Sequence, residues 1–256
     1  MGIAGILILQ VYHSVKIMFI RPFFCVGLIL FIVMNNFTLA RDLTRLEVPG
    51  GCGLLLNHFG PYDYRDPSRK DEIYLVEKAH FDLEVFRLEN AGRDGRNAPP
   101  GGGIDYTLRA FPNHHRALDA LSRLVIKEKN LKPQNMTWPS ECYFKRAIIF
   151  APDDGVVYHI YGNYLYRIGK IEEAITAYKK AIALIPDYAE AHYNLGLILY
   201  KQKRYAESQV HAKKAYSLNY PLAALKEKLK SVGCWESGNN ILNEAKCRLN
   251  GTKLRP

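Results

Sequence analysis

Cysteine is scarce in this chain of 256 residues, and the spacing of the five cysteines excludes two common uses of the residue. No pair is separated as in a zinc ribbon or a CxxC redox motif, so the cysteines predict neither a structural zinc site nor a dithiol active site. Gly101-Gly102-Gly103 lacks the lysine and the strand of a phosphate-binding loop, and we expect a flexible connection there. No Ser/His/Asp or Cys/His arrangement has supporting sequence around it. The sequence therefore predicts no catalytic residue and no cofactor.

Two further features of the sequence argue against a metal site and against a separate catalytic domain. The adjacent residues His114 and His115 would point about 100° apart on a helix, so they do not predict a metal site; we expect His114 to pack and His115 to be exposed. At 48% hydrophobic content the chain can build one ordinary helical domain and has no room for a separate catalytic domain.

Acidic residues are missing from residues 1–40, which have the pattern of an export signal. Lys16 and Arg21 precede an apolar stretch from Phe23 to Val33, and Thr38-Leu39-Ala40 resembles a cleavage site. The apolar run is short for a membrane span, so we expect a signal peptide over 1–40, with Met18 as a possible true start, and a periplasmic protein. An uncleaved anchor in the inner membrane is the alternative.

Residues 155–222 contain one pattern twice, at the 34-residue period of stacked helix-turn-helix units. The first copy has small or apolar residues at key positions, namely Tyr158, Gly162, Leu165, Gly169, Ala174, Tyr178, Ala181 and Pro186. The corresponding residues of the second copy are His192, Gly196, Leu199, Lys203, Ser208, Ala212, Ala215 and Tyr220. Gly162 with Ala174, and Gly196 with Ser208, supply the small side chains that two antiparallel helices need where they cross.

These residues resemble the tetratricopeptide repeat, and the chain as a whole is similar to small exported bacterial tetratricopeptide proteins of unassigned activity. The resemblance implies an all-α, right-handed helical solenoid. Its expected parts are an irregular leader with short helices and a Gly/Pro loop (41–104), a degenerate helix pair with an inserted loop (105–154), two repeats (155–188 and 189–222), a cap helix (223–233) and a tail (234–256). Within them, Asp82 is expected to cap a leader helix and Pro112 to occupy the first turn of a helix running from about Asn113 to Glu128.

With Cys25 in the signal, four cysteines remain for three possible pairings in an oxidising compartment. Cys52 with Cys142 would tie the leader to the repeats, and Cys234 with Cys247 would close the tail. Alternatively, Cys142 is a small buried apolar residue of a helix.

The formal charge of +10 would attract an acidic protein surface, or weakly an anionic lipid or polysaccharide, although such an excess is usually only a solvated surface. The basic residues are scattered over helix faces without a base-stacking motif, so nucleic acid is not expected as a partner.

In this family the first helix of each unit lines an inner groove. The resemblance places Val156, Ile160 and Glu190 among the lining positions and implies a partner-binding groove formed by His159, Asn163, Tyr166, Arg167, Tyr193, Asn194, Leu197, Tyr200, Lys201 and Lys228. A carboxylate clamp, as in some family members, is not expected, because His159 replaces a lysine and Ala224 another basic residue.

We therefore expect a non-catalytic adaptor that binds another envelope protein or peptide. An accessory or enzyme-like role in polysaccharide or peptidoglycan processing, through Phe59 to Arg65 and Asp105 to His115, is the alternative. A third is a purely stiffening part of an assembly.

Overall fold

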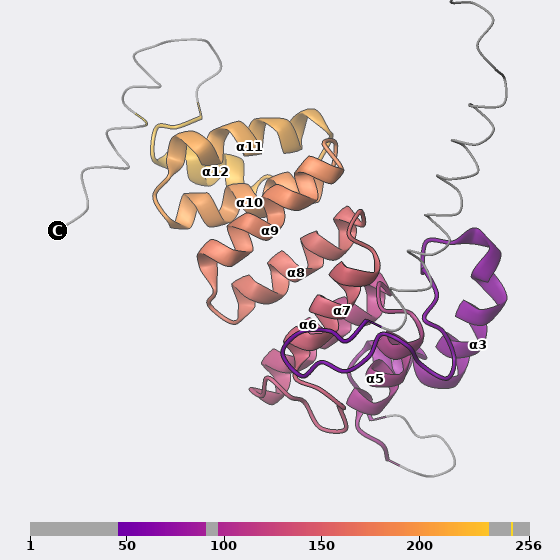
Figure 1. The fold of residues 1–256 in the computed structure, drawn as a ribbon. Helices are drawn as coiled ribbons and strands as arrows, with labels where there is room; N and C mark the ends of the chain where they lie inside the picture. Colours follow the sequence, from indigo (N-terminus) through magenta and orange to yellow (C-terminus); the bar gives the residue numbers. More distant parts are fainter. Residues whose placement is uncertain (1–45, 91–96, 236–246, 248–256) are drawn as a thin grey trace, which may run out of the picture. The chain divides into compact units, whose positions relative to one another are not determined.

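The computed structural model describes residues 46–90, 97–235 and 247, which belong to one compact unit, Leu46–Pro256. The expected signal peptide, residues 1–40, lies outside the described residues. The described part is an all-α helical solenoid without β-strands (Figure 1), and Glu47 and Leu54 are joined by an isolated bridge. None of the helices in this part has the length and apolarity needed to cross a membrane.

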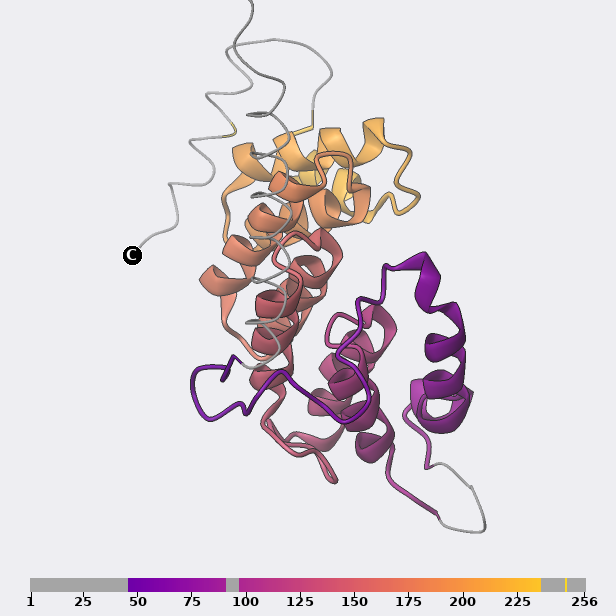
Figure 2. The ribbon, with the colours of Figure 1, turned by 45° about the vertical axis from the view of Figure 1, so that its right-hand side comes forward.

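The leader contains a 3₁₀ turn, η1 (Pro67–Arg69), and two short helices, α3 (Lys70–His80) and α4 (Leu83–Phe86). As expected, Asp82 is the N-cap of α4. Its carboxylate accepts a hydrogen bond from the Val85 amide at 3.0 Å, which satisfies a donor of the first turn. The segment before η1, drawn in indigo, crosses the helical part formed by residues 100–150 (Figures 1 and 2), where the Tyr62 amide donates to the Ala110 carbonyl oxygen at 2.9 Å.

The glycine run is helical, which corrects the expectation of a flexible connection. Helix α5 (Pro100–Ala110) contains all three glycines, with Pro100 at its first position, where a missing amide hydrogen costs nothing. A Cβ at Gly101 would lie 2.0 Å from the Gln134 carbonyl oxygen, and one at Gly103 would lie 2.1 Å from the His80 carbonyl oxygen. The glycines therefore serve close backbone packing, which local composition does not reveal.

Helix α6 (His115–Glu128) and helix α7 (Ser140–Phe150) follow, with an irregular connection between them. Pro112 is not in the first turn of α6, because it lies in the joint before the helix. His114 is the N-cap of α6, and its side chain accepts a hydrogen bond from the Ala117 amide at 3.1 Å.

The two repeats form antiparallel pairs, α8 (Gly155–Arg167) with α9 (Ile171–Leu184) and α10 (Ala189–Lys201) with α11 (Tyr205–Ser217). They stack side by side in both views of the ribbon (Figures 1 and 2). The small residues do meet the partner helices: Gly162 faces the Tyr178 ring, and Ser208 Oγ donates to the Gly196 carbonyl oxygen at 2.7 Å. Helix α12 (Ala224–Ser231) covers the end of the second pair, with Leu225 against Gly196.

A joint of one geometry recurs three times between consecutive helices. Phe111, Ala151 and Ile185 end α5, α7 and α9 with the same φ of −131° and with ψ between 72° and 87°. The next residue is Pro112, Pro152 or Pro186, and a helix begins three residues after each proline. Helix α5 therefore holds the place of a second repeat helix, one unit upstream of the degenerate pair expected from the sequence.

Candidate functional site

A cavity of about 340 Å³ lies between the first helices of the two repeats, α8 and α10. Its lining residues are Asn163, Tyr166, Arg167, Tyr178, Glu190, Asn194, Leu197, Ile198 and Lys201. Six of these are residues that the sequence assigned to the groove, and Glu190 holds an expected lining position. Tyr178 was missed because it comes from the second helix α9 and reaches across Gly162, and Ile198 because it is almost fully buried at the cavity floor.

One stripe of α10 supplies an acidic, an amide, an apolar and a basic side chain in order. Glu190, Asn194, Leu197 and Lys201 are spaced at i, i+4, i+7 and i+11, and at about 100° per residue these positions stay on one helix face. The side chains of Asn194 and Leu197 are half-buried, whereas Glu190 and Lys201 are exposed. The helix therefore presents four different chemistries along one line.

Amide and phenol groups form a connected floor beneath this stripe. The Tyr178 hydroxyl donates to Asn163 Oδ1 at 2.6 Å, and Asn194 Nδ2 donates to Asn163 Oδ1 at 3.3 Å and to His159 Nε2 at 3.0 Å. The second ring nitrogen of His159, Nδ1, lies 3.0 Å from the Tyr188 hydroxyl. These bonds fix both asparagine side chains before any ligand arrives.

His159 supports the floor from below instead of lining the groove, which corrects its expected place. Its side chain is buried, and burial lowers its pKa to about 4. The imidazole is therefore neutral at pH 7, and Nε2 accepts the bond from Asn194.

The three charged side chains of the cavity, Arg167, Lys201 and Glu190, differ in whether a group of opposite charge lies beside them. Arg167 donates to Ser122 Oγ at 2.7 Å and lies 3.5 Å from the Asp119 carboxylate. Lys201 contacts the Tyr166 hydroxyl and lies 4.9 Å from the centre of that ring. Partial desolvation and the Asp119 charge raise the pKa of Glu190, and among the described residues the basic nitrogen within ion-pair distance of its carboxylate is the neutral His159 Nε2, at 4.0 Å.

Three other expected groove residues lie away from the cavity. Tyr193 is only 4% exposed and packs against the ring of Tyr220, with 4.4 Å between ring centroids, in the core beneath α12. Tyr200 packs on Tyr205, and the Lys228 ammonium lies 5.9 Å from the Tyr200 ring centroid. The cap helix thus makes Tyr193 a core residue, which the repeat consensus could not show.

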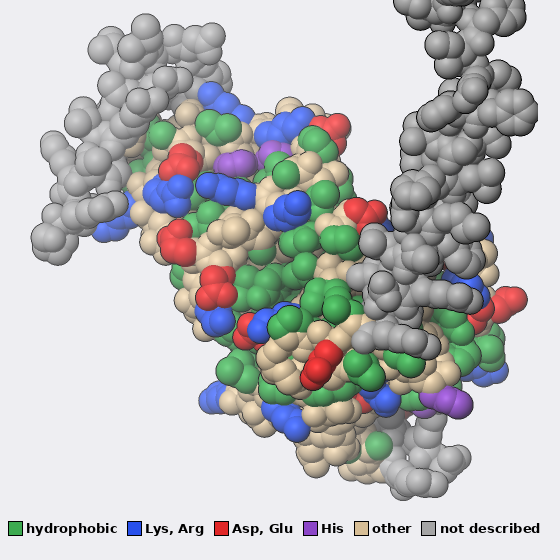
Figure 3. All heavy atoms as spheres, viewed as in Figure 1, with side chains coloured by type: hydrophobic (Ala, Val, Ile, Leu, Met, Phe, Trp, Pro, Cys, Tyr) green, Lys and Arg blue, Asp and Glu red, His purple; other side chains and the backbone are tan. Residues whose placement is uncertain are grey.

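A second hollow of about 550 Å³ lies over α8 and α9, where hydrophobic side chains line a concave surface (Figure 3). Its lining residues are Tyr158, Tyr161, Leu165, Glu172, Glu173, Thr176, Ala177 and Lys180. The rim residue Glu173 pairs with Lys170 at 3.4 Å, and the Lys180 ammonium lies 5.9 Å from the Tyr158 ring centroid. The hollow is larger than the cavity between α8 and α10, but its polar groups give no sign of what would occupy it.

The two unusual segments outside the repeats, Phe59 to Arg65 and Asp105 to His115, meet in a polar joint. Asn113 accepts from the Tyr64 amide at 2.9 Å and donates to Asp63 at 2.7 Å and Asp154 at 3.1 Å. The charge and hydrogen bonds of Arg65 outweigh burial and lower the pKa of Asp63 to about 2. This joint holds the leader against the start of α8.

The histidine pair belongs to the same joint. The fully buried His114 stacks on Tyr64, with 4.1 Å between ring centroids, and its Nε2 lies 3.0 Å from Glu77. His115 is half-buried instead of exposed, because its Nε2 lies 2.9 Å from the carboxylate of Asp154, which begins α8. Each imidazole thus has its own carboxylate partner. In the ranges described, no three His, Cys, Asp or Glu side chains gather so as to hold a metal ion.

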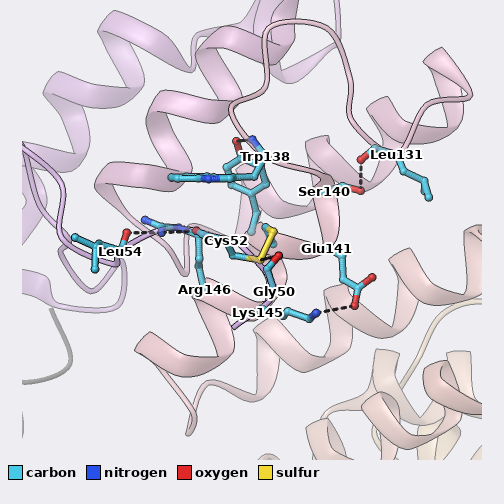
Figure 4. The surroundings of a disulfide bond; sticks show 11 residues. Gly50, Cys52, Leu54, Leu131, Trp138, Ser140, Glu141, Lys145 and Arg146 are labelled. Atoms are coloured by element: carbon cyan, nitrogen blue, oxygen red, sulfur yellow. Dashed lines mark hydrogen bonds and ion pairs between the residues drawn. A yellow bond between two sulfur atoms is a disulfide. The ribbon is translucent and has the colours of Figure 1, made fainter. Parts of the chain in front are cut away.

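A disulfide joins Cys52 of the leader to Cys142 of α7, beside a buried arginine (Figure 4). The Arg146 guanidinium lies 4.5 Å from the ring centroid of Trp138 and donates to the carbonyl oxygens of Cys52 and Leu54 at 3.1 and 2.5 Å. Burial lowers its pKa to about 10. A second disulfide, Cys234 to Cys247, ties the tail to the end of α12.

Two protein-family models match the part of the chain that contains the helical pairs α8–α9 and α10–α11. Residues 162–203 match a family model described as TPR repeat, and residues 189–221 match one described as tetratricopeptide repeat. No curated protein matches the chain. Among solved structures, the chain is similar to one titled "Crystal structure of MamA", at 18% identity and a TM-score of 0.42, with 60% of this chain and 85% of that chain covered.

Proposed function

Because the chain carries tetratricopeptide repeats, we propose that it is a non-catalytic adaptor of the cell envelope that holds a segment of a partner protein in the cavity between α8 and α10. Repeats of this family are typically scaffolds for protein–protein interaction. The finer proposal, that the cavity is the binding site, depends mainly on one observation: the amide floor of Asn163 and Asn194 is already fixed in the free chain.

Preorganisation favours binding because a ligand then loses less free energy to ordering the site. Tyr178 and His159 hold the two asparagine side chains in place, and both of these supporting residues are buried. Amide groups suit a peptide, since an asparagine both donates to a carbonyl oxygen and accepts from an amide hydrogen. Leu197 supplies an apolar surface within the same cavity.

The envelope location is supported by the export-signal pattern of residues 1–40 and by the two disulfides, which persist in an oxidising compartment. We propose the periplasm, with an uncleaved inner-membrane anchor as the alternative form. The basic surface would add only weak contact with anionic lipid or polysaccharide.

Selection from a phage-displayed library of random peptides tests the binding site. Peptides selected on the wild-type chain are measured by fluorescence anisotropy against Leu197→Glu, which adds a negative charge to the cavity, and Lys201→Glu, which reverses the sign of an existing charge. We expect a loss of tenfold or more in affinity for both variants, with unchanged helical content and melting temperature.

Lys213→Glu is the matched control. Lys213 is exposed on α11, and its substitution changes the net charge by the same amount as Lys201→Glu without touching the cavity. Selected peptides that bind all three variants as tightly as the wild type would overturn the proposed site.

A further inference from the structure

The two charges at the ends of the α10 stripe have no partner of opposite sign within the described residues. Glu190 faces only a neutral imidazole, and Lys201 rests on the ring and hydroxyl of Tyr166 without an ion pair. The third charge of the cavity, Arg167, is already compensated by Asp119. A bound segment would therefore meet one unpaired negative charge and one unpaired positive charge.

These two charges lie at a fixed separation along one line. Eleven residues separate Glu190 from Lys201, and at 1.5 Å per residue this places their Cα atoms about 16 Å apart along the helix. The angular offset over eleven residues is only about 20°, so both side chains point to the same face. An extended peptide covers that distance in about five residues at 3.3 Å each, whereas a helical peptide needs about eleven.

The middle of the stripe favours the extended form. Asn194 and Asn163 offer amide groups in the cavity between the two charges, and backbone groups of an extended chain can pair with such side chains. The interior of a helical peptide has already paired its own backbone groups and would leave these amides without backbone partners. Leu197 lies between Asn194 and Lys201 and provides a contact for one apolar side chain.

We infer that the occupant of this cavity is an extended peptide segment with a basic side chain at Glu190 and an acidic side chain at Lys201, about four to six positions apart, and an apolar residue between them. This inference rests on the proposed function, because it requires a peptide in the cavity. It specifies the partner by the charge pattern of the bound segment.

Sequencing the library peptides selected on different variants tests the charge pattern. On the wild-type chain we expect enrichment of one Lys or Arg and one Asp or Glu, separated by about four to six positions. On Glu190→Lys the basic residue should be replaced by a second acidic one, and on Lys201→Glu the acidic residue by a second basic one. These expectations hold for either chain direction of the peptide. Lys213→Glu should select the wild-type pattern.

An affinity measurement checks the same pairing. A peptide selected on the wild type should lose about tenfold in affinity for Glu190→Lys. Changing the basic residue of the peptide to Glu should restore its affinity for this variant. Both cavity positions are exposed, so circular dichroism and melting should match the wild type.

The outcomes separate the inference from the proposed function. Peptides that depend on Leu197 but show no charge pair, or whose pattern does not follow the variants, would overturn the inference and leave the site intact. A charge pair separated by about eleven positions would mean a helical ligand and would also overturn it. If no selected peptide depends on the cavity residues, both fail.

Discussion

The ring of Tyr178 packs so closely on Gly162 that a Cβ at position 162 would lie 2.8 Å from the ring carbons Cδ1 and Cε1. The same contact directs the Tyr178 hydroxyl to Asn163 at 2.6 Å. One small residue at a helix crossing therefore both closes the first repeat and shapes the cavity floor.

Gly162→Ala should destabilise the chain and also weaken peptide binding. The buried ring of Tyr178 must move, and overpacking of this kind costs about 1–3 kcal/mol. Chemical denaturation gives the free energy of unfolding, and anisotropy with a library-selected peptide gives the affinity. If the variant is as stable as the wild type, α8 and α9 are not packed as closely as described.

The three glycines of α5 should differ from one another when each is changed to alanine. Gly101→Ala and Gly103→Ala should each cost about 1–3 kcal/mol, because their Cβ atoms would meet backbone carbonyl oxygens. Gly102→Ala serves as the matched control, since its Cβ would have only an ordinary contact at 3.7 Å, and it should leave stability unchanged or raise it by up to about 1 kcal/mol. Three equal values in urea denaturation would restore the flexible-connection interpretation.

Removing the disulfide between leader and α7 should lower stability more than removing the tail disulfide. The chain-entropy model gives about 4–5 kcal/mol for a sequence separation of 90 residues and about 3 kcal/mol for one of 13. The double variants Cys52→Ala/Cys142→Ala and Cys234→Ala/Cys247→Ala can be compared by denaturant unfolding. A tail variant that is the less stable of the two would contradict the proposed order.

Acidification below pH 6.5 should destabilise the fold through its buried histidines. Burial lowers the pKa of His159 and of His211 to about 4, and also lowers those of His114 and His192. The unfolded chain therefore binds more protons than the folded chain between pH 6.5 and about 4, so the stability present above pH 6.5 is lost as the pH falls through this window.

For His159, which is 2% exposed, this effect amounts to roughly 3 kcal/mol at about 1.4 kcal/mol per tenfold change in proton affinity. Urea unfolding at a series of pH values measures the slope, and His159→Gln should reduce it. A slope that this substitution leaves unchanged would show that His159 titrates normally in the folded chain.

The sequence predicts the repeat pairs well because their packing is local. Gly162 and Gly196 lie at helix crossings within single units, so the 34-residue period alone locates them. The upstream units are harder to predict. Pro112 and Pro152 hold the same place in the joint but are 40 residues apart, because the connection after α6 is longer, and the period is therefore broken.

The cavity residues that the sequence did not predict correctly were missed for a different reason. The residues of α8 and α10 were predicted from their place in the repeat, but Tyr178 enters from α9 through the space that Gly162 leaves. Tyr193 was assigned to the groove because the consensus treats every unit alike, and packing with Tyr220 beneath α12 buries it. Contacts between units and with a cap depend on tertiary structure that a repeat consensus does not contain.

Methyl NMR of leucine-labelled and isoleucine-labelled chain, titrated with a library-selected peptide, tests the central claim most directly. We predict that the methyl signals of Leu197 and Ile198 shift, while that of Leu222, exposed before α12, stays unchanged. Shifts confined to Leu165, in the hollow over α8 and α9, would contradict the proposed site.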